Sequence, residues 1–571
     1  MNRDPARSNS SALHHLLPSV RDIVFICLFC SLLSGPLSNR LLADVDIGWH
    51  IQNGEIMLAT REIPRTDPFS STMRGQPWYA WEWLYDLTLG ALHKADGLNA
   101  VAWLAALLIS LTLALLLSEL IKRGIGLPLV LALMLLAAAA TSIHMFARPH
   151  IVSWLFVLVW FVALERWEQG RAPRWIPWLF PLSMLLWVNL HGAWLLGIAL
   201  LVFYTFAVAV ESVRAADAIQ RIQAGHRART IARALAGSII ATLVNPYGWN
   251  LHIHVYRYLS DRYLVDRIVE FRSPDFHGWA QRSFAVIVLI ALLAFVGSAR
   301  KPRLVHVLIA IFAVYAGFFA TRNLPVSSIL LVLVAGPILW ENVVAIAERP
   351  AAWHRLRNLA IRLKTFSARM GEQELQLQGH LWPVLTVIVA LMLCLHGGRA
   401  GSWQLVNAEF DPEHVPVAAT NYLDRQPDRG PVFAVDQWGG YLIYRLYPRR
   451  LVVIDDRHDL FGPDRFREYL TLVQVEPGWR EVLDKWKIHT MVLPAGSALA
   501  NLLLELPRDW QVVHEDKVAV VFEKSGTSSA GLSKSVREVF SRTAIRPFMA
   551  IRSCHVWIGY NSLQPVAVAD I

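Results

Sequence analysis

Residues 100–121 read AVAWLAALLISLTLALLLSELI, an apolar run that contains one charged residue, Glu119. A helix needs about 20 such residues to cross a hydrocarbon core about 30 Å thick. Similar runs recur along the chain of 571 residues, which is 55% hydrophobic and only 17% charged. Soluble proteins are about one quarter charged. The sequence therefore predicts an integral membrane protein with several spans.

The spacing of the apolar runs sets the expected architecture. It predicts an all-α polytopic membrane bundle of about eleven transmembrane helices over residues 22–396, with a large loop at 39–99, after an N-terminal segment at 1–21. The expected spans are residues 22–38, 100–121, 126–146, 149–165, 175–189, 192–212, 235–250, 282–299, 304–320, 324–345 and 379–396.

Basic residues orient this bundle. With the N-terminus in the cytoplasm, the inner connections are short and basic, as at Lys122-Arg123 and Arg300-Lys301, which the positive-inside rule requires. The loop 39–99 and the chain after residue 396 then face the outer side of a bacterial inner membrane. Because topology explains the net charge of +10 better than a binding patch does, no nucleic-acid partner is expected.

Strand-like and helix-like stretches alternate after the last span. This alternation predicts an extracytoplasmic α/β domain over residues 397–524 with a mostly parallel sheet, and residues 518–523 as a further edge strand. The linker composition after Lys524 predicts a poorly ordered tail at 525–571. The expected strands are 431–435, 451–454 and 490–493, and the expected helices lie around 438–446, 464–474, 479–487 and 497–506.

The first outer loop opens with Asp44 and Asp46, followed by His50. Paired carboxylates can act as a general base or hold a divalent cation such as Mg or Mn. The alternative is a solvated loop start in which an Asp caps a helix over 47–59. The rest of the loop is rich in aromatic residues, so it is expected to lie on the membrane surface as short amphipathic helices.

Other unusual polar residues fall on the same side. Each one alone could be a helix cap, a kink or an interfacial anchor, but ionisable groups near membrane depth are costly and tend to mark function. Their common side favours one site assembled from loops on a helical scaffold. The candidates for substrate binding are His50, Arg148, His150, Asn189, His191, Glu270 and Arg322.

The motif Asp44-Val45-Asp46 after the first span, the long first loop and the outer C-terminal domain resemble the GT-C superfamily of membrane glycosyltransferases. The superfamily includes bacterial relatives of protein O-mannosyltransferases and of the lipid A aminoarabinose transferase. Residues 44–84, 436–442 and 454–457 look like a bacterial subgroup of such proteins. The resemblance follows the order of elements from about residue 20 to residue 524.

The resemblance implies a hexosyltransferase type of enzyme that uses a polyprenyl-phosphate sugar donor and a glycan, lipid or protein acceptor. It implies that Asp44 or Asp46 is the acidic catalytic residue, which deprotonates the acceptor or ligates a cation. From their chemistry, Arg148 and Arg322 are expected to bind the donor phosphate, because a guanidinium fork matches phosphate oxygens. The three candidate histidines could add phosphate contacts or metal ligation.

Two other functions stay open at this point. A transporter or flippase of a lipid-linked substrate would show internal repeats and charges near the bilayer midplane. The sequence has no convincing repeat, and its charges lie at the ends of spans. A non-catalytic membrane scaffold with an envelope-facing binding domain is the other alternative, since a fold can persist without its chemistry.

Overall fold

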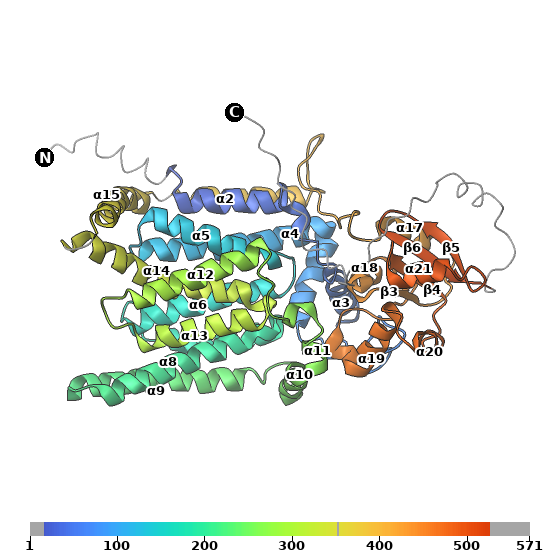
Figure 1. Cartoon of the computed structure of the whole chain (residues 1–571), viewed down its shortest axis with the longest axis horizontal. Helices are drawn as coiled ribbons and strands as arrows, with labels where there is room; N and C mark the ends of the chain where they lie inside the picture. The colour runs from blue at the N-terminus through green and yellow to red at the C-terminus, as the bar shows by residue number, and fades with distance from the viewer. Residues whose placement is uncertain (1–15, 351–352, 378, 526–571) are drawn as a thin grey trace.

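The computed structural model describes residues 16–350, 353–377 and 379–525. Helices form one elongated bundle, and a small α/β unit lies at one end of it (Figure 1). Most of the expected tail, and the first fifteen residues, lie outside the described residues.

Among the described residues, six helical segments are long and apolar enough to cross a membrane. The protein is therefore a multi-pass membrane protein by helix length and composition, but the expected count of about eleven spans is not confirmed. The six are α4 (Trp83–Lys122), α5 with η2 (Leu127–His144), α6 (His150–Glu168), η4 with α8 (Gly192–Arg214), α12 (Trp279–Val296) and η6 with α14 (Thr321–Glu348).

Shorter apolar helices coincide with other expected spans. These are η3 with α7 (Ile176–Leu190), α13 (Leu304–Phe319) and α16 (Leu381–Cys394). Helix α2 (Val20–Leu33) covers most of the first expected span, 22–38. The remaining helices of the bundle side are η1 (Ser38–Arg40), α3 (Ile47–Thr60), α9 (Ala218–Ala241), α10 (Trp249–Ser260), α11 (Arg262–Val265), η5 (Val269–Phe271) and α15 (His354–Gln376).

The seventh expected span, 235–250, is not one helix. It begins inside α9, which ends at Ala241, crosses the turn between the two helices and finishes in the first residues of α10. The Asn245 side chain donates to the carbonyl oxygens of Thr242 and Gly248, and Gly248 has a φ of 54° that favours glycine. Local hydrogen bonding thus turns the chain where apolar composition predicts a continuous span.

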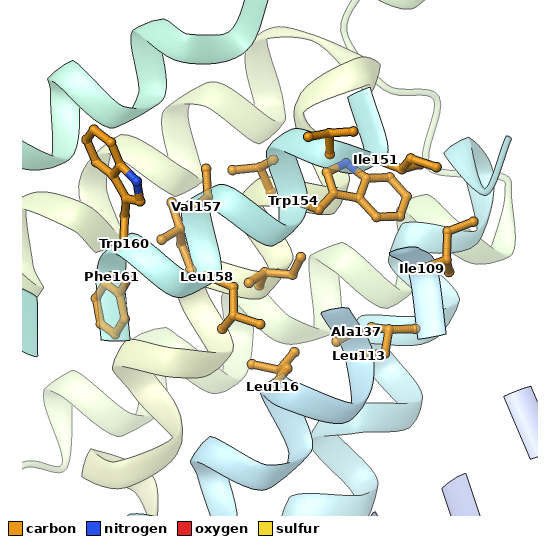
Figure 2. Close-up of a cluster of buried hydrophobic side chains, with 14 of the residues drawn as sticks. Ile109, Leu113, Leu116, Ala137, Ile151, Trp154, Val157, Leu158, Trp160 and Phe161 are labelled. Atoms are coloured by element: carbon orange, nitrogen blue, oxygen red, sulfur yellow. The ribbon is translucent and has the colours of Figure 1, made fainter. Parts of the chain in front are cut away.

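The bundle core consists of apolar side chains that interlock between α4, α5 and α6. Figure 2 shows Leu113 and Leu116 of α4 beside Ala137 of α5, and Trp154 and Leu158 of α6. All five are at most 2% exposed. In a lipid environment close packing of this kind, rather than escape from water, holds helices together.

The α/β unit contains a mixed sheet in the order β3-β4-β6-β5. Only β3 and β4 are parallel, so the expectation of a mostly parallel sheet is wrong. Asp516 explains the difference, because its carboxylate accepts from the backbone N–H groups of Val518 and Ala519 and reverses the chain into a hairpin. The strands are β3 (Val432–Ala434), β4 (Thr490–Pro494), β5 (Trp510–Glu515) and β6 (Ala519–Lys524), and a separate small pair is β1 (Arg399–Ala400) and β2 (Trp403–Gln404).

The expected edge strand is therefore the interior strand β6, and β5 forms the edge that composition did not reveal. The four expected helices are present, and one more precedes them. They are α17 (Val417–Arg425), which was not expected, and α18 (Asp436–Leu446), α19 (His458–Val473), α20 (Trp479–Lys485) and α21 (Ala498–Leu504).

The expected strand 451–454 is only a bridge, and it joins the α/β unit to the first loop. Val452 pairs in parallel with Val432 of β3 on one side and with Ser70 of the loop on the other. The backbone N–H of Ser71 donates to the Val452 carbonyl at 2.8 Å, and that of Val452 donates to the Phe69 carbonyl at 3.2 Å. The loop thereby extends the edge of the sheet.

Helix α3 of the first loop packs against α18, as its position between bundle and sheet in Figure 1 indicates. A Cβ atom on Gly48 would lie 2.3 Å from the Gly440 carbonyl oxygen, and one on Gly440 would lie 2.5 Å from the Val45 carbonyl oxygen. Only glycine permits this approach. Loop residues Trp49 and Phe69 share the hydrophobic core of the α/β unit, so the loop is a packed element rather than a set of surface-lying amphipathic helices.

Candidate functional site

Arg148 lies at the centre of a cluster of carboxylates where the first loop meets the bundle. Its Nη1 atom is 2.8 Å from Asp44 Oδ2, 3.1 Å from Asp46 Oδ2 and 3.2 Å from Glu270 Oε1. These residues come from the first loop, from the turn before α6 and from η5. Three segments distant in sequence thus share one guanidinium group, and four of the expected site residues lie together.

The local backbone explains why Arg148 points there. The turn that carries it is tied to the first loop, because the N–H of Ala147 donates to the Leu41 carbonyl at 2.8 Å. The hydroxyl of Tyr85, at the start of α4, donates to the Ala147 carbonyl at 3.1 Å. The turn is therefore held from both sides.

Asp46 occupies the N-cap position of α3, but its side chain makes no capping hydrogen bond. The Asp44 carboxylate instead accepts from the Asp46 backbone N–H at 3.3 Å. The Asp46 side chain is 4% exposed and is directed to Arg148. The alternative in which the Asp46 side chain caps the helix is therefore wrong.

Arg322 approaches the cluster through Glu270. Its Nε atom is 3.9 Å from Glu270 Oε2, and its guanidinium group lies over the Phe271 ring, 4.6 Å from the centroid. Burial alone would raise the pKa of Glu270, but Arg148 and Arg322 lower it below its ordinary value. Glu270 is thus an anion that connects two cations.

The α/β unit adds a carboxyl group, Asp456, to this cluster. Burial raises the pKa of Asp46 well above its ordinary value, and the neighbouring carboxylates of Asp456 and Asp44 raise it further. Burial also raises the pKa of Asp456, to about 7. Paired carboxyl groups that resist ionisation are typical of functional sites. Asp456 was not among the candidate residues; the available sequence signal was its position just after the expected strand 451–454, and nothing in the sequence shows which other residues it meets.

Next to the cluster lies a second row of buried polar groups. His50 Nδ1 donates to Asp86 Oδ1 at 2.6 Å, and the Asn53 amide donates to Asp86 Oδ2 at 2.7 Å. His50 Nε2 is 3.9 Å from Glu82 Oε2, and His191 Nε2 is 3.6 Å from Glu82 Oε1. Glu82 therefore lies between the two histidines.

Burial controls the charge of this row. It lowers the pKa of His50 to about 3, which keeps the imidazole neutral, and raises the pKa of Glu82 to about 7. Sequence reasoning did not select Glu82 or Asp86. The available signal was their spacing of four residues at the start of α4, which puts both on one helix face.

Two expected site residues make structural contacts instead. His150 Nε2 donates to the His144 carbonyl at 2.7 Å. The Asn189 amide donates to the carbonyl oxygens of Leu185 and Val244, and its oxygen accepts from Trp83 Nε1 at 2.7 Å. Asn189 thus ties helix ends together beside the cluster.

Arg457 fixes the α/β unit to the first loop. Its Nη2 atom is 2.7 Å from Asp455 Oδ2 and 2.9 Å from Asp67 Oδ1, and its guanidinium group lies over the Trp78 ring. All of this is buried. Asp455 is therefore bound in an ion pair, and its neighbour Asp456 is held at the edge of the cluster.

The expectation of Mg or Mn at Asp44 and Asp46 meets an obstacle in this geometry. Within the described ranges, no three His, Cys, Asp or Glu side chains are disposed to hold a metal ion. The two carboxylates are directed to the Arg148 guanidinium, which already supplies positive charge between them. The residues as arranged do not fit a divalent cation.

No protein-family model matches the chain, and no curated protein matches its sequence. Among solved structures, the apo oligosaccharyltransferase of Archaeoglobus fulgidus is similar, with a TM-score of 0.51, 12% identity and coverage of 83% of this chain and 69% of that one. AglB from the same organism, in complex with an inhibitory peptide and a dolichol-phosphate, gives a TM-score of 0.51 at 10% identity, over 92% and 75% of the two chains.

ArnT from Cupriavidus metallidurans, bound to undecaprenyl phosphate, aligns over 93% of this chain and 100% of its own, with 14% identity and a TM-score of 0.45. At these identities the likeness concerns the fold, and it rests on the two archaeal structures. The chain therefore shares the fold of these archaeal oligosaccharyltransferase structures, and the resemblance that the sequence predicts is confirmed at the level of the fold.

Proposed function

We propose that the protein is an inner-membrane glycosyltransferase that moves a sugar from a polyprenyl-phosphate donor to an extracytoplasmic acceptor. The observation that carries the proposal is the cluster around Arg148, in which two arginines and several carboxyl groups meet where the helical bundle joins the first loop. Cations suited to a phosphate and carboxylates suited to a hydroxyl are the two requirements of such a transfer.

The proposal includes the topology that the basic residues predict, with a cytoplasmic N-terminus and an outer α/β domain over residues 397–524. It also includes the shorter apolar helices α2, α7, α13 and α16 as spans, which brings the number close to eleven. The contact between the α/β domain and the site supports a role of this domain in positioning the acceptor.

Arg322 is suited to bind the donor phosphate. Its guanidinium group is one-third exposed, and its contact with Glu270 is long, so its N–H donors are available to a ligand. Arg148 lies closer to its carboxylates, at 2.8 and 3.1 Å, so it contributes positive charge to the site without a direct contact to the donor phosphate. Charge that develops on the departing phosphate would be stabilised by both arginines.

Asp46 is suited to accept the proton of the acceptor hydroxyl. As that proton leaves, the acceptor oxygen forms a bond to the anomeric carbon of the sugar. The bond from this carbon to the phosphate oxygen breaks, and its electron pair stays on the polyprenyl phosphate. Because burial raises the pKa of Asp46, its carboxylate is a stronger base than a solvated aspartate.

The direct test uses the full-length protein in lipid nanodiscs with radiolabelled undecaprenyl-phosphate hexoses. Product is followed as free sugar released to water and as sugar transferred to membrane extracts. Asp44→Asn or Asp46→Asn should abolish product without loss of protein from the membrane. Asp275→Asn, at an exposed position of the loop that carries Glu270, is the matched control and should leave activity unchanged.

Full activity of the single variants and of the double variant would exclude this role for the two acids. Transport provides the contrasting outcome: proteoliposomes that accumulate the lipid-linked sugar without a glycosidic product would point to a flippase.

A further inference from the structure

The carboxyl groups around Arg148 all contact a single cation, and this cation is a side chain of the protein itself. One nitrogen atom, Nη1, contacts Asp44, Asp46 and Glu270 at 2.8, 3.1 and 3.2 Å. Asp456 of the α/β domain lies beside Asp46, and its charge also acts on Arg148. These carboxylates raise the pKa of Arg148 above its ordinary value, against the effect of burial.

Carboxylate oxygens are the ligands that hard divalent cations take, at about 2.0–2.6 Å. Here the oxygens of Asp44, Asp46 and Glu270 face the guanidinium nitrogen instead. A divalent ion among them would lie within a few ångströms of the Arg148 positive charge, which is only 21% exposed, so water screens the repulsion less than at an open surface.

We infer that Arg148 is an internal cation that occupies the position of a divalent metal, so that the site works without one. The catalytic part of this inference rests on the proposed transferase function. It departs from the sequence-based expectation of Mg or Mn at Asp44 and Asp46. A guanidinium group is suited to this task because it stays charged at any physiological pH.

The α/β domain takes part in this arrangement through its backbone. Gly439 and Gly440 lie side by side in α18, and a Cβ on them would lie 2.6 Å from Asp455 Cα and 2.8 Å from Asp46 Cα respectively. The close approach brings the segment of Asp456 to the first loop. The internal cation therefore neutralises acids from both parts of the molecule.

The inference predicts that removal of the guanidinium creates a metal site. Mn²⁺ binding to the full-length protein in nanodiscs is measured by electron paramagnetic resonance for the wild type, Arg148→Ala and Arg322→Ala. Arg148→Ala should bind one Mn²⁺ at least about tenfold more tightly than the wild type, because three carboxylates lose their counter-charge. Arg322→Ala is the matched control and should behave as the wild type, since Arg148 remains in place.

Further variants keep this test decisive. Arg148→Met replaces Arg148→Ala if the smaller side chain prevents insertion. The double variant Arg148→Ala/Asp46→Asn should lose the gained Mn²⁺ affinity, which assigns the ion to this cluster. Tight Mn²⁺ binding by the wild type, or no gain in either Arg148 variant, would overturn the inference.

Sugar release from undecaprenyl-phosphate hexoses gives the second measurement. Wild-type turnover should be unchanged after treatment with EDTA and insensitive to added Mn²⁺. If EDTA abolished turnover and Mn²⁺ restored it, the inference that Arg148 replaces a metal ion would be wrong. Absence of turnover from every donor, combined with the expected Mn²⁺ pattern, would count against the proposed function alone and would support the assignment of Arg148.

Discussion

Charged clusters lie near both ends of α6, one with several carboxyl groups around one arginine and the other with several donors around one carboxylate. At the first end, one arginine, Arg148, lies among several carboxyl groups. At the other end, one carboxylate, Glu165, accepts from the Tyr204 hydroxyl at 2.6 Å and from Arg303 Nη1 at 2.9 Å, with His306 Nε2 3.2 Å away. Both clusters combine a buried carboxyl group, Asp46 or Glu165, with partly exposed arginines, and both are built from segments far apart in sequence.

The two clusters differ in the balance between their carboxyl groups and their cations. Glu165 is surrounded by hydrogen-bond donors and cations, which is how buried charges are stabilised in a purely structural role. At the Arg148 end, carboxyl groups outnumber the cations, and burial raises the pKa values of Asp46 and Asp456, with a further contribution from the neighbouring Asp44 carboxylate. Perturbed pKa values cluster at functional sites, so this difference supports the role that we propose for the Arg148 end.

Asp46→Asn should have the largest effect on sugar transfer, and it tests whether the Arg148 end is functional and not structural. Loss of a general base should lower sugar transfer by about 10²- to 10⁴-fold. The variant removes a buried acid from an acid-rich cluster, so its melting temperature should stay equal to that of the wild type or rise. Activity and thermal unfolding, measured on the same nanodisc preparation, test both parts. A fall in melting temperature as large as the loss of activity would mean that Asp46 is structural.

Gly440→Ala tests whether the α/β domain has to dock closely for the site to work. The added Cβ would lie 2.5 Å from the Val45 carbonyl oxygen and should push the domain away from the acids of the first loop. A misplacement of about 1 Å can cost about 10²-fold in rate. Gly371→Ala, whose Cβ would meet nothing within 4 Å, is the matched control. Equal transfer rates in both variants would contradict a role of docking.

Glu165→Gln should show the reverse pattern to Asp46→Asn. It leaves Arg303 and His306 without their shared carboxylate, and a lost hydrogen bond to a charged group costs about 2 kcal/mol. We expect a lower melting temperature and an unchanged transfer rate per folded molecule. Reduced turnover at temperatures where the variant is fully folded would show that the two ends are coupled.

A further expected effect is a pH dependence of stability at Glu82. Its pKa is raised from 4.5 to about 7, so the folded state retains a proton that the unfolded chain releases. Stability should therefore fall as pH rises from about 4.5 through about 7. Glu82→Gln should flatten this dependence of the melting temperature. An equal slope in the wild type and the variant would assign the titration to another group.

The sequence predicted part of the site for a clear reason. Asp44, Asp46, Arg148, Glu270 and Arg322 all follow or precede apolar runs at the same side of the bundle, so topology alone brings them to one region. Glu82 and Asp86 were missed because they look like part of an aromatic loop until α3 packs against α4. Asp456 falls within the segment 454–457 that carries the family resemblance, but its meeting with Asp46 depends on the glycine contact between α3 and α18.

For the fold as well, local features were predicted from the sequence and features that depend on tertiary contacts were not. Most of the expected apolar helices are present, because apolar length is a local property, although the count of about eleven spans is not confirmed. The strand 451–454 and the mostly parallel sheet were predicted wrongly. Pairing in a sheet depends on partners such as Val432 and Ser70, which local propensity does not specify. The span 235–250 failed because hydrogen bonds of Asn245 turn the chain within an apolar stretch.

The sequence by itself determined that this chain is a multi-pass membrane protein with polar groups gathered at one side. Hydrophobic length and charge asymmetry are local properties of the chain, and they decide which segments can cross a bilayer and in which orientation. Only the tertiary structure decided that Arg148 is the common partner of acids from separate segments. The contacts of one guanidinium group depend on how distant elements pack, and no local pattern encodes them.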